Sequence, residues 1–205
     1  ASGMHNVLMS GPPGAGKTMA ARCLTGILPP LEFEESMELT KIYSVRGMLG
    51  DRKEIIRQRP FRAPHHTITT TALIGGGVIP KPGEVSLAHN GVLFLDELPE
   101  FGKGTIEAMR QPLEEKGVVI GRLNAAYRFP ANIMLVGAMN PCPCGCYPDR
   151  NKCRCTQPQI EKYLGKISGP ILDRIDLCVE LHPVDILHLQ KTKVEKSSED
   201  MRQQI

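Results

Sequence analysis

Short runs of apolar residues recur along the chain and alternate with longer stretches of helical spacing. The apolar runs are residues 5–10, 91–96, 133–138 and 175–181, and the helical stretches are residues 16–28, 103–115 and 157–166. Continuous apolar runs of this length are typical of strands buried on both faces, as in a parallel sheet that helices cover. The alternation therefore predicts an α/β fold with a parallel sheet.

Two hairpins and one linker are expected between these elements. The segments of the hairpins are residues 117–122 and 126–129 around 123–125, and residues 75–77 and 80–83 around Val78 and Ile79. The first two segments are predicted to form two strands, and the other two a short hairpin that leads into a helical region. Residues 32–38 are acidic and, with residues 39–47, are expected to form a linker with one short helix.

The composition limits the class of protein. A chain of 205 residues with 41% hydrophobic residues can form one α/β core with a small addition. No run approaches the roughly eighteen apolar residues that cross a bilayer, so no membrane segment is expected. The net charge of +3 is compatible with a nucleic-acid partner but does not by itself indicate one.

A glycine-rich segment lies between the first apolar run and the first helical stretch. It consists of Gly11, Pro12, Pro13, Gly14, Ala15, Gly16, Lys17 and Thr18. In a strand, loop and helix, this G-x-x-x-x-G-K-[ST] pattern predicts a phosphate-binding loop whose backbone N–H groups surround the phosphates. Lys17 adds a positive charge, and Thr18 adds an oxygen ligand for Mg²⁺. The segment predicts a site for a nucleoside triphosphate.

Asp96 and Glu97 follow four apolar residues that read as a buried strand. The strand would present Asp96 at its carboxyl edge, where the carboxylate holds Mg²⁺ through the water shell of the ion. Glu97 is then placed to polarise an attacking water, so the pair favours hydrolysis over binding alone. The alternative is that Glu97 is an exposed residue at the end of a strand.

Two further polar residues follow later strands. Asn140 comes after the run 133–138 and can bind the γ-phosphate or orient the water; the alternative is a turn residue before Pro141. Arg174 precedes the last strand, too far along the fold to reach its own nucleotide, so we expect it to reach the nucleotide of a neighbouring subunit. Alternatively, Arg174 pairs with Asp173 or Asp176.

Five of the seven cysteines lie within fourteen residues. Two Cys-x-Cys pairs could supply four thiolates to a structural Zn²⁺ with no open position. These residues are Cys142, Cys144, Cys153 and Cys155. A loop of reduced thiols without metal is the equal alternative, and Cys146 has no place in the metal scheme. Cys23 and Cys178 lie in apolar runs and are expected in the core.

The predicted nucleotide site and the two ends of the chain indicate a cellular compartment and a relation to a longer protein. A nucleotide site without a leader sequence or membrane run predicts a cytoplasmic protein, in which cysteines are thiols or metal ligands. The chain begins at Ala1 without a Met, and its polar end, residues 191–205, reads as a helix or linker. We therefore expect a domain excised from a longer protein.

The order of these parts resembles the AAA+ ATPases, and within them the magnesium-chelatase-like clade. The segments 59–67, 82–89, 91–100, 138–145 and 168–176 are similar to segments of the ComM/YifB family. The resemblance covers residues 5 to about 184. It implies a three-layer αβα core with a five-stranded parallel sheet, ATP and Mg²⁺ as cofactors, a homo-hexameric ring, and DNA branch migration in recombination and natural transformation.

The resemblance also assigns roles to residues and segments. Lys17, Thr18, Asp96, Glu97, Asn140 and Arg174 take the nucleotide roles given above. An insertion at about 74–85, with Lys81, and a hairpin at about 118–130, with Arg122 and Arg128, would line the pore as candidate DNA contacts. Residues 1–184 would form the core, with the cysteine loop at 142–155, and residues 185–205 would lead to a helical lid. The lid, the adenine-binding segment and a Lon-like domain lie outside these 205 residues, so we expect weak ATP binding and little turnover by this chain alone.

Other readings stay open. The same clade includes magnesium-chelatase motor subunits and protein-remodelling chaperones, which move a different substrate. The basic stretch 52–62 could contact phosphates or could be a solvated face. His65 and His66 lack the spacing of metal ligands, so we expect a role in packing or hydrogen bonding. Without the resemblance, the sequence predicts a ring-forming ATPase that moves a substrate, and it does not identify that substrate.

Overall fold

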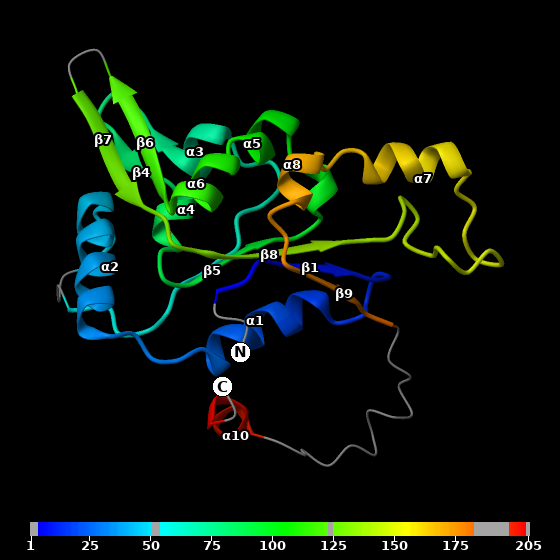
Figure 1. Ribbon diagram of the computed structural model, residues 1–205, viewed down its shortest axis with the longest axis horizontal. Coiled ribbons are helices and arrows are strands. Elements are labelled where there is room, and N and C mark those ends of the chain that lie inside the picture. The colour runs from blue at the N-terminus through cyan, green and yellow to red at the C-terminus, as the bar shows by residue number, and fades with distance from the viewer. Residues whose placement is uncertain (1–3, 51–53, 123–124, 183–196, 204–205) are drawn as a thin grey trace.

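The computed structural model describes residues 4–50, 54–122, 125–182 and 197–203 (Figure 1). The strands are β1 (Val7–Ser10), β2 (Phe61–Arg62), β3 (Gly75–Gly76), β4 (Lys81–Pro82), β5 (Val92–Leu95), β6 (Gly117–Arg122), β7 (Ala125–Pro130), β8 (Met134–Met139) and β9 (Leu177–Glu180). The helices are α1 (Lys17–Ile27), α2 (Phe33–Arg46), α3 (Thr70–Ile74), α4 (Glu84–Leu87), the 3₁₀ turn η1 (Leu98–Glu100), α5 (Lys103–Glu107), α6 (Arg110–Glu115), α7 (Gln157–Leu164), α8 (Gly169–Leu172) and α10 (Ser198–Gln203).

A five-stranded parallel sheet in the order β2-β5-β8-β1-β9 forms the centre of the fold. The strands predicted from the four apolar runs are β1, β5, β8 and β9, and the predicted parallel sheet is confirmed. Two-residue β2 completes one edge and was not predicted as a strand of the sheet. Parallel strands place their carboxyl ends at one edge, where β1, β5 and β8 deliver the polar residues of the nucleotide motifs.

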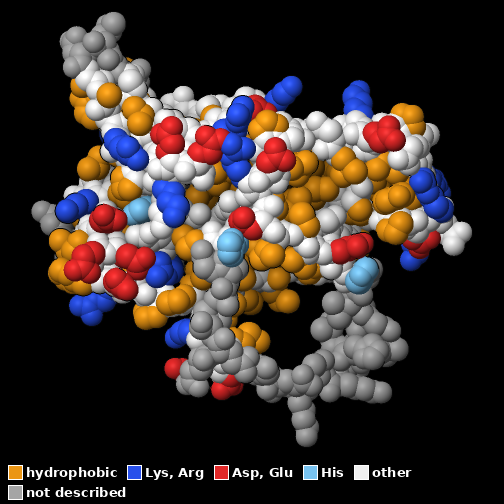
Figure 2. Space-filling view, in the orientation of Figure 1, with side chains coloured by type: hydrophobic (Ala, Val, Ile, Leu, Met, Phe, Trp, Pro, Cys, Tyr) orange, Lys and Arg blue, Asp and Glu red, His pale blue; other side chains and the backbone are white. Residues whose placement is uncertain are grey.

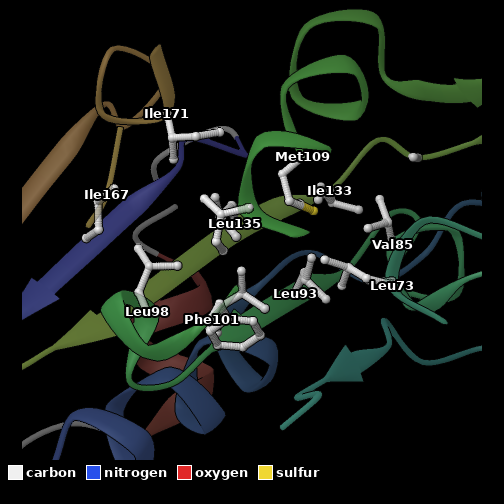
Figure 3. Packing of buried hydrophobic residues seen from close by; sticks show 14 of the residues in the cluster. Leu73, Val85, Leu93, Leu98, Phe101, Met109, Ile133, Leu135, Ile167 and Ile171 are labelled. Carbon is white, nitrogen blue, oxygen red and sulfur yellow. The ribbon is translucent and has the colours of Figure 1, made fainter. Parts of the chain in front are cut away.

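Helices cover both faces of the sheet at β1, β5 and β8, which explains why these strands are mostly apolar at successive positions. Leu8, Leu93 and Leu135 point to one face, where they pack with residues of α3, α4, α5 and α8 (Figure 3). The residues next to them in each strand point to the opposite face and pack in a cluster with Ala21 of α1; these residues include Val7, Val92 and Met134. Because successive side chains of a strand point to opposite faces, two apolar layers need apolar residues at every position. The expected α/β fold, with three αβα layers and a five-stranded parallel sheet, is confirmed (Figure 1).

The expected linker at 32–47 is wrong, because the structure has one helix of 14 residues there, α2. The side chain of Glu32 and the third helical residue, Glu35, form a capping box, so each satisfies a backbone N–H of the first turn. Leu39 and Ile42, three residues apart, are buried. Gly47 ends the helix with a left-handed φ of 76°, which glycine adopts without strain.

The single helix expected at 103–115 is also wrong, because the structure divides it into α5 and α6. Pro112 lies in the first turn of α6 and has no N–H to donate to the carbonyl of residue 108. The interruption falls at Ala108 and Met109, where Met109 N donates to Ile106 O at 3.0 Å. The proline therefore accounts for the missing continuity.

Both expected hairpins are present and contact each other. β6 pairs with β7 in antiparallel register from Gly117↔Pro130 to Arg122↔Ala125, and β3 pairs with β4. Ala125, expected in the turn, belongs to β7, and residues 123 and 124 lie outside the described residues. A Cβ at Gly75 would lie 3.0 Å from Ile120 Cδ1, so the hairpins are packed together. Both project from the same end of the molecule (Figure 1).

Part of the predicted C-terminal linker is helical. In the described residues 197–203, α10 lies against α1, and Arg202 Nη2 donates to Gly26 O at 2.6 Å. The other residues of the predicted linker, 185–196 and 204–205, lie outside the described part of the chain.

Two cysteines expected in the core are exposed. Cys23 on α1 and Cys178 on β9 both reach solvent. The apolar neighbours of Cys23 occupy the buried side of α1, with Ala21 fully buried, and Cys23 lies on the other side of the helix. β9 is the outer strand of the sheet, and all four of its residues are exposed. An apolar run at the edge of a sheet does not guarantee burial.

Two arginines of the basic stretch stabilise the fold, so neither the phosphate-contact nor the solvated-face reading holds for them. Arg59 Nη2 lies 3.0 Å from Glu35 Oε2 on α2, and its Nη1 donates to Asn90 O at 2.7 Å. Arg62 donates to both oxygens of Glu84, from Nε at 2.6 Å and from Nη2 at 2.8 Å. Residues 52 and 53 lie outside the described residues.

Replacing Arg62 with Gln should reduce the free energy of unfolding by about 2 kcal/mol, because a partly buried carboxylate of Glu84 loses a bidentate partner. Urea denaturation followed by circular dichroism measures this. The control is Arg57→Gln at an exposed position nearby, expected within about 0.5 kcal/mol of the parent. Equal stability of the two variants would contradict the structural role of Arg62.

Candidate nucleotide site and cysteine cluster

The phosphate-binding loop joins the carboxyl end of β1 to the first residue of α1. Gly14 and Gly16 have φ values of 79° and 81°, a left-handed conformation that residues with a Cβ rarely adopt. A Cβ at Gly11 would lie 2.5 Å from Leu181 O. The glycines therefore allow a tight loop at the N-terminus of α1, the place where a helix can bind an anion.

Lys17 is buried at the centre of this loop. Its Nζ donates to Gly11 O at 2.5 Å, to Pro12 O at 2.9 Å and to Asn140 Oδ1 at 3.1 Å. Burial lowers the pKa of Lys17, and the negative charge of Asp96 partly opposes this shift. Three oxygen acceptors thus hold the ammonium at the loop, where phosphate oxygens can replace the carbonyls as partners.

Thr18 and Asp96 are brought together from α1 and the end of β5. Thr18 Oγ1 donates to Asp96 Oδ2 at 2.8 Å, and Glu97 N donates to Asp96 Oδ1 at 3.0 Å. A hydroxyl and a carboxylate side by side are the hard oxygen donors that Mg²⁺ takes from proteins, beside phosphate oxygens and water. The two side chains fit the magnesium role predicted for them.

Glu97 adopts an uncommon backbone conformation, with φ 52° and ψ 46°. A left-handed conformation costs energy for a residue with a Cβ and is often found at functional sites. It turns the chain from β5 into η1 and leaves the Glu97 carboxylate 57% exposed. The carboxylate is therefore open to a water molecule at the same edge of the sheet as the phosphate loop.

His66 contacts Glu97 and was missed as a site residue by the sequence analysis. His66 Nδ1 lies 3.3 Å from Glu97 Oε2. The ring packs against His65, with centroids 4.0 Å apart, and edge-on to Phe101 at 6.4 Å. The predicted packing is present, and the predicted hydrogen bonding is made by His65, whose Nδ1 lies 2.9 Å from Thr67 Oγ1. His66 instead contacts the carboxylate of the proposed water-activating residue. The sequence contains no signal for this contact, because it depends on β2 lying beside β5.

Asn140 follows β8, which lies between β5 and β1 in the sheet. Its amide oxygen accepts from Lys17, so the side chain faces the phosphate loop from the neighbouring strand. The predicted grouping of Asn140 with the loop and with the Asp-Glu strand corresponds to this geometry. Leu95↔Gly137 and Met9↔Ala138 are the registers that align the three strand ends.

Arg174 lies at the opposite edge of the sheet. Its carbonyl accepts from Asn6 Nδ2 at 2.8 Å, and Asn6 precedes β1. From Asn6 to Gly11, five residues of extended chain span about 16 Å. Arg174 pairs with Glu114 and donates to Pro170 O, while Nε is buried without a hydrogen-bond partner among the described residues. The expected alternative of a pair with Asp173 or Asp176 is wrong.

The hairpins carry exposed cations and an exposed apolar tip. Lys81 and Arg128 are exposed, and Arg128 Nη2 donates to Glu115 O at 3.4 Å; the side chain of Arg122 lies outside the described part. At the tip of the β3–β4 hairpin, Val78 is 99% and Ile79 74% exposed. Figure 2 shows acidic and basic side chains interspersed on this face, without one continuous basic patch.

The cysteine loop gathers four sulfur atoms in one cluster. Cys142 Sγ lies 3.4 Å from Cys144 Sγ and 3.8 Å from Cys153 Sγ, and Cys144 and Cys153 are 3.6 Å apart. With Cys155, all four sulfurs lie within 4.8 Å of one another. Four thiolates at 2.3 Å from a tetrahedral zinc ion are about 3.8 Å apart, so the spacing fits one such ion.

The chemistry of the thiols agrees with this geometry. A backbone hydrogen bond from Cys146, followed by the thiol of Cys142, lowers the pKa of Cys144 to about 6. Cys146 itself lies outside the cluster, as predicted, and its thiol donates to Cys144 O at 3.6 Å. Burial and the hydrogen bonds of neighbouring thiols raise the pKa of Cys153 to about 12 and also raise the pKa of Cys155, so Cys144 is the thiol of the cluster that ionises most easily.

The chain is similar to a known family over most of its length. The family model described as magnesium chelatase, subunit ChlI, matches residues 1–189. YifB of Salmonella typhimurium is 50% identical over 200 residues, which are 97% of this chain and 39% of that protein. Competence protein ComM of Haemophilus influenzae is 51% identical over 193 residues, 94% of this chain and 37% of that protein. The chain thus spans about two fifths of the length of these relatives.

A more distant relative is the magnesium-chelatase 67 kDa subunit of Heliobacterium mobile, 25% identical over 171 residues, 68% of this chain and 25% of that protein. Within residues 4–50, 54–122, 125–182 and 197–203, no helix combines the length and apolar content that crossing a bilayer requires.

Replacing His66 with Ala should lower kcat for ATP about tenfold with little change in KM, because the Glu97 carboxylate loses its positioning partner while the phosphate loop is untouched. Steady-state kinetics of the full-length protein measure both constants. His66→Asn, which keeps a donor, should recover part of kcat. His65→Ala is the matched control; a loss of equal size in this variant would assign the effect to packing.

Proposed function

Because the chain belongs to the magnesium-chelatase-like ComM/YifB family of AAA+ ATPases, we propose that it is the ATP-hydrolysing core of a ring motor that acts on DNA. The observation that carries the ATPase assignment is the convergence of Lys17, Thr18, Asp96 and Asn140 at one edge of the sheet, with Glu97 at the end of β5. The cofactors that we propose are ATP and Mg²⁺, with a structural Zn²⁺ at the four cysteines. We also propose a cytoplasmic location, because the motor needs ATP and the cysteines are free thiols.

The phosphate loop would bind the triphosphate through its backbone N–H groups and Lys17. Thr18 and Asp96 would hold Mg²⁺, which neutralises phosphate charge when bound. Glu97 accepts a proton from the attacking water, His66 keeps the Glu97 carboxylate in place, and the Asn140 amide orients the water or the γ-phosphate. These groups position and polarise the reactants, which is most of what phosphoryl transfer requires from a protein.

The position of Arg174 supports a ring. Its guanidinium is at the amino edge of the sheet, while the phosphate loop is at the carboxyl edge. In a ring of identical subunits packed in a head-to-tail manner, the amino edge of one subunit can face the nucleotide of the next. Arg174 would then stabilise the charge that develops on the phosphates, and hydrolysis would depend on assembly.

DNA is the substrate that the hairpin cations favour. Lys81 and Arg128 are exposed on two hairpins that are packed together and project from one end of the molecule. Exposed cations on neighbouring projections can contact successive phosphates and release their counterions. The H. influenzae relative is named a competence protein.

A protein-remodelling motor is a second candidate, and it rests on the apolar tip of the β3–β4 hairpin. Val78 and Ile79 are exposed together, and apolar residues at the end of a projecting hairpin suit contact with an unfolded chain. A relative named Lon protease 2, from Bacillus subtilis, is 27% identical over an alignment, gaps included, of 211 positions that covers 89% of this chain and 37% of that protein. A chelatase motor is the third, and the H. mobile relative carries that name.

The ATPase rate of the full-length protein should rise severalfold with single-stranded or branched DNA, and the stimulation should fade between about 50 and 200 mM salt. Arg128→Ala should weaken DNA binding and reduce the salt dependence by about one counterion. The matched control is Lys162→Ala, an exposed cation on α7 at the opposite end of the molecule. A flat response to DNA at every salt concentration would reject the DNA motor and favour a protein or porphyrin substrate.

Arg174→Ala should lower kcat roughly 10³-fold while ATP binding is retained, because the arginine acts on the nucleotide of a neighbour. Mixing Arg174→Ala subunits with Lys17→Ala subunits should restore part of the rate, since the second variant supplies Arg174 and the first supplies an intact phosphate loop. The control mixture uses a double variant, Lys17→Ala with Arg174→Ala, as the second partner. Absence of rescue at every ratio would count against action between subunits.

A further inference from the structure

In the sequence, the cysteine cluster directly follows a residue of the nucleotide site. Cys142 is two residues after Asn140, whose side chain accepts a hydrogen bond from Lys17. The second pair ends at Cys155, and the next residue, Thr156, forms the capping box of α7. The cluster therefore joins the strand that carries Asn140 to the start of a helix, through a loop without regular secondary structure.

The loop also contacts the phosphate loop itself. Gly145, which follows Cys144, has a φ of 78°, and a Cβ there would lie 2.6 Å from Pro13 Cδ and 3.8 Å from Asn140 Cγ. The backbone of Gly145 thus packs against Pro13, within the segment that surrounds the phosphates. One loop consequently meets the nucleotide site twice, at Lys17 through Asn140 and at Pro13 through Gly145.

The residues around the sulfur atoms bury part of the cluster and give one of them a backbone hydrogen bond, as expected at a structural metal site. Cys142 is fully buried and Cys153 is 7% exposed, and both pack with the buried side chain of Ile160 on α7. Tyr147 N donates to Cys142 Sγ at 3.4 Å, a contact of the kind that stabilises a thiolate ligand. Cys144 reaches solvent, which gives an ion an entry path.

We propose that Cys142, Cys144, Cys153 and Cys155 bind one zinc ion, and that the zinc-bound loop is a structural part of the ATP site. The ion holds Gly145 against Pro13 and keeps Asn140 beside Lys17. The zinc site stands on the sulfur geometry alone, whereas its effect on ATP rests on the proposed function. Four thiolates leave no open position, so the ion acts on the shape of the loop and takes no part in hydrolysis.

The ligand type and the sulfur spacing favour zinc over other cations. Soft thiolates favour zinc, copper(I) or iron over magnesium and calcium, and four sulfurs around one point favour a tetrahedral ion. The short distances between the sulfurs suit one ion. Iron in place of zinc is an outcome that metal analysis distinguishes.

The first measurement is the metal content of the full-length protein by inductively coupled plasma mass spectrometry, with one zinc per subunit expected. The double variant Cys144→Ser/Cys153→Ser should lose the zinc, and its Kd for a fluorescent ATP analogue, measured with excess Mg²⁺, should rise about tenfold. The matched control is Cys146→Ser, which lies in the same loop outside the cluster and should keep both the zinc and the affinity.

A second variant tests the contact without disturbing the ligands. Gly145→Asn places a Cβ against Pro13, while asparagine tolerates the left-handed backbone of this position. It should keep one zinc per subunit and still bind the analogue about tenfold more weakly. Removing zinc from the parent with a chelator and adding zinc back should weaken and then restore the affinity.

Each result decides one part of the proposal. Iron, or no metal, in the parent protein would overturn the zinc assignment. Unchanged affinity in Gly145→Asn, or after zinc removal, would overturn the link to the ATP site, even if the double cysteine variant fails to fold. If the parent protein binds zinc but no ATP analogue at all, the proposed function fails while the metal site stands.

Discussion

The ammonium group of Lys17 must find oxygen acceptors once burial removes it from water, and this requirement organises the centre of the fold. Two of its acceptors are carbonyls of the phosphate loop, and the third is the amide of Asn140. Loop and amide belong to segments more than one hundred residues apart, and they meet because β1 pairs with β8 in parallel register. A buried cation with satisfied donors is tolerated, whereas an unpaired one is costly. The sheet order is thus tied to the chemistry of one side chain.

The parallel direction of the strands gives the two ends of the sheet different residues. Parallel strands deliver Lys17, Asp96, Glu97 and Asn140 to the carboxyl edge, so residues at the amino edge are distant from the phosphate loop. Arg174 is at that edge, beside Asn6 and Glu114. This placement supports the proposal that Arg174 acts on the nucleotide site of another subunit. The strand directions support the proposed assembly independently of the sequence comparisons.

The sequence predicted the sheet and the phosphate loop well, because both depend on local patterns. Apolar runs mark strands buried on both faces, and the glycine pattern marks a loop with left-handed residues. It failed where a longer-range contact decides. The acidic start of α2 obscured a capping box, and Arg59 and Arg62 look like a phosphate-binding stretch until Glu35 and Glu84 are placed beside them.

The contact between His66 and Glu97 shows most clearly what a sequence lacks. His66 belongs to the loop after two-residue β2, and this strand adds to the sheet only through its register with β5, Phe61↔Val92 and Arg62↔Leu93. Glu97 has a left-handed backbone conformation, and its carboxylate contacts His66 in this loop. Strain at Glu97 and the short strand β2 are separate features of the chain, and together they bring an imidazole to the carboxylate. A neighbouring side chain that contacts a strained residue can limit the motion of its carboxylate. Under the proposed function, placement of the attacking water would depend on His66, which lies thirty residues before Asp96 in the loop after the edge strand β2.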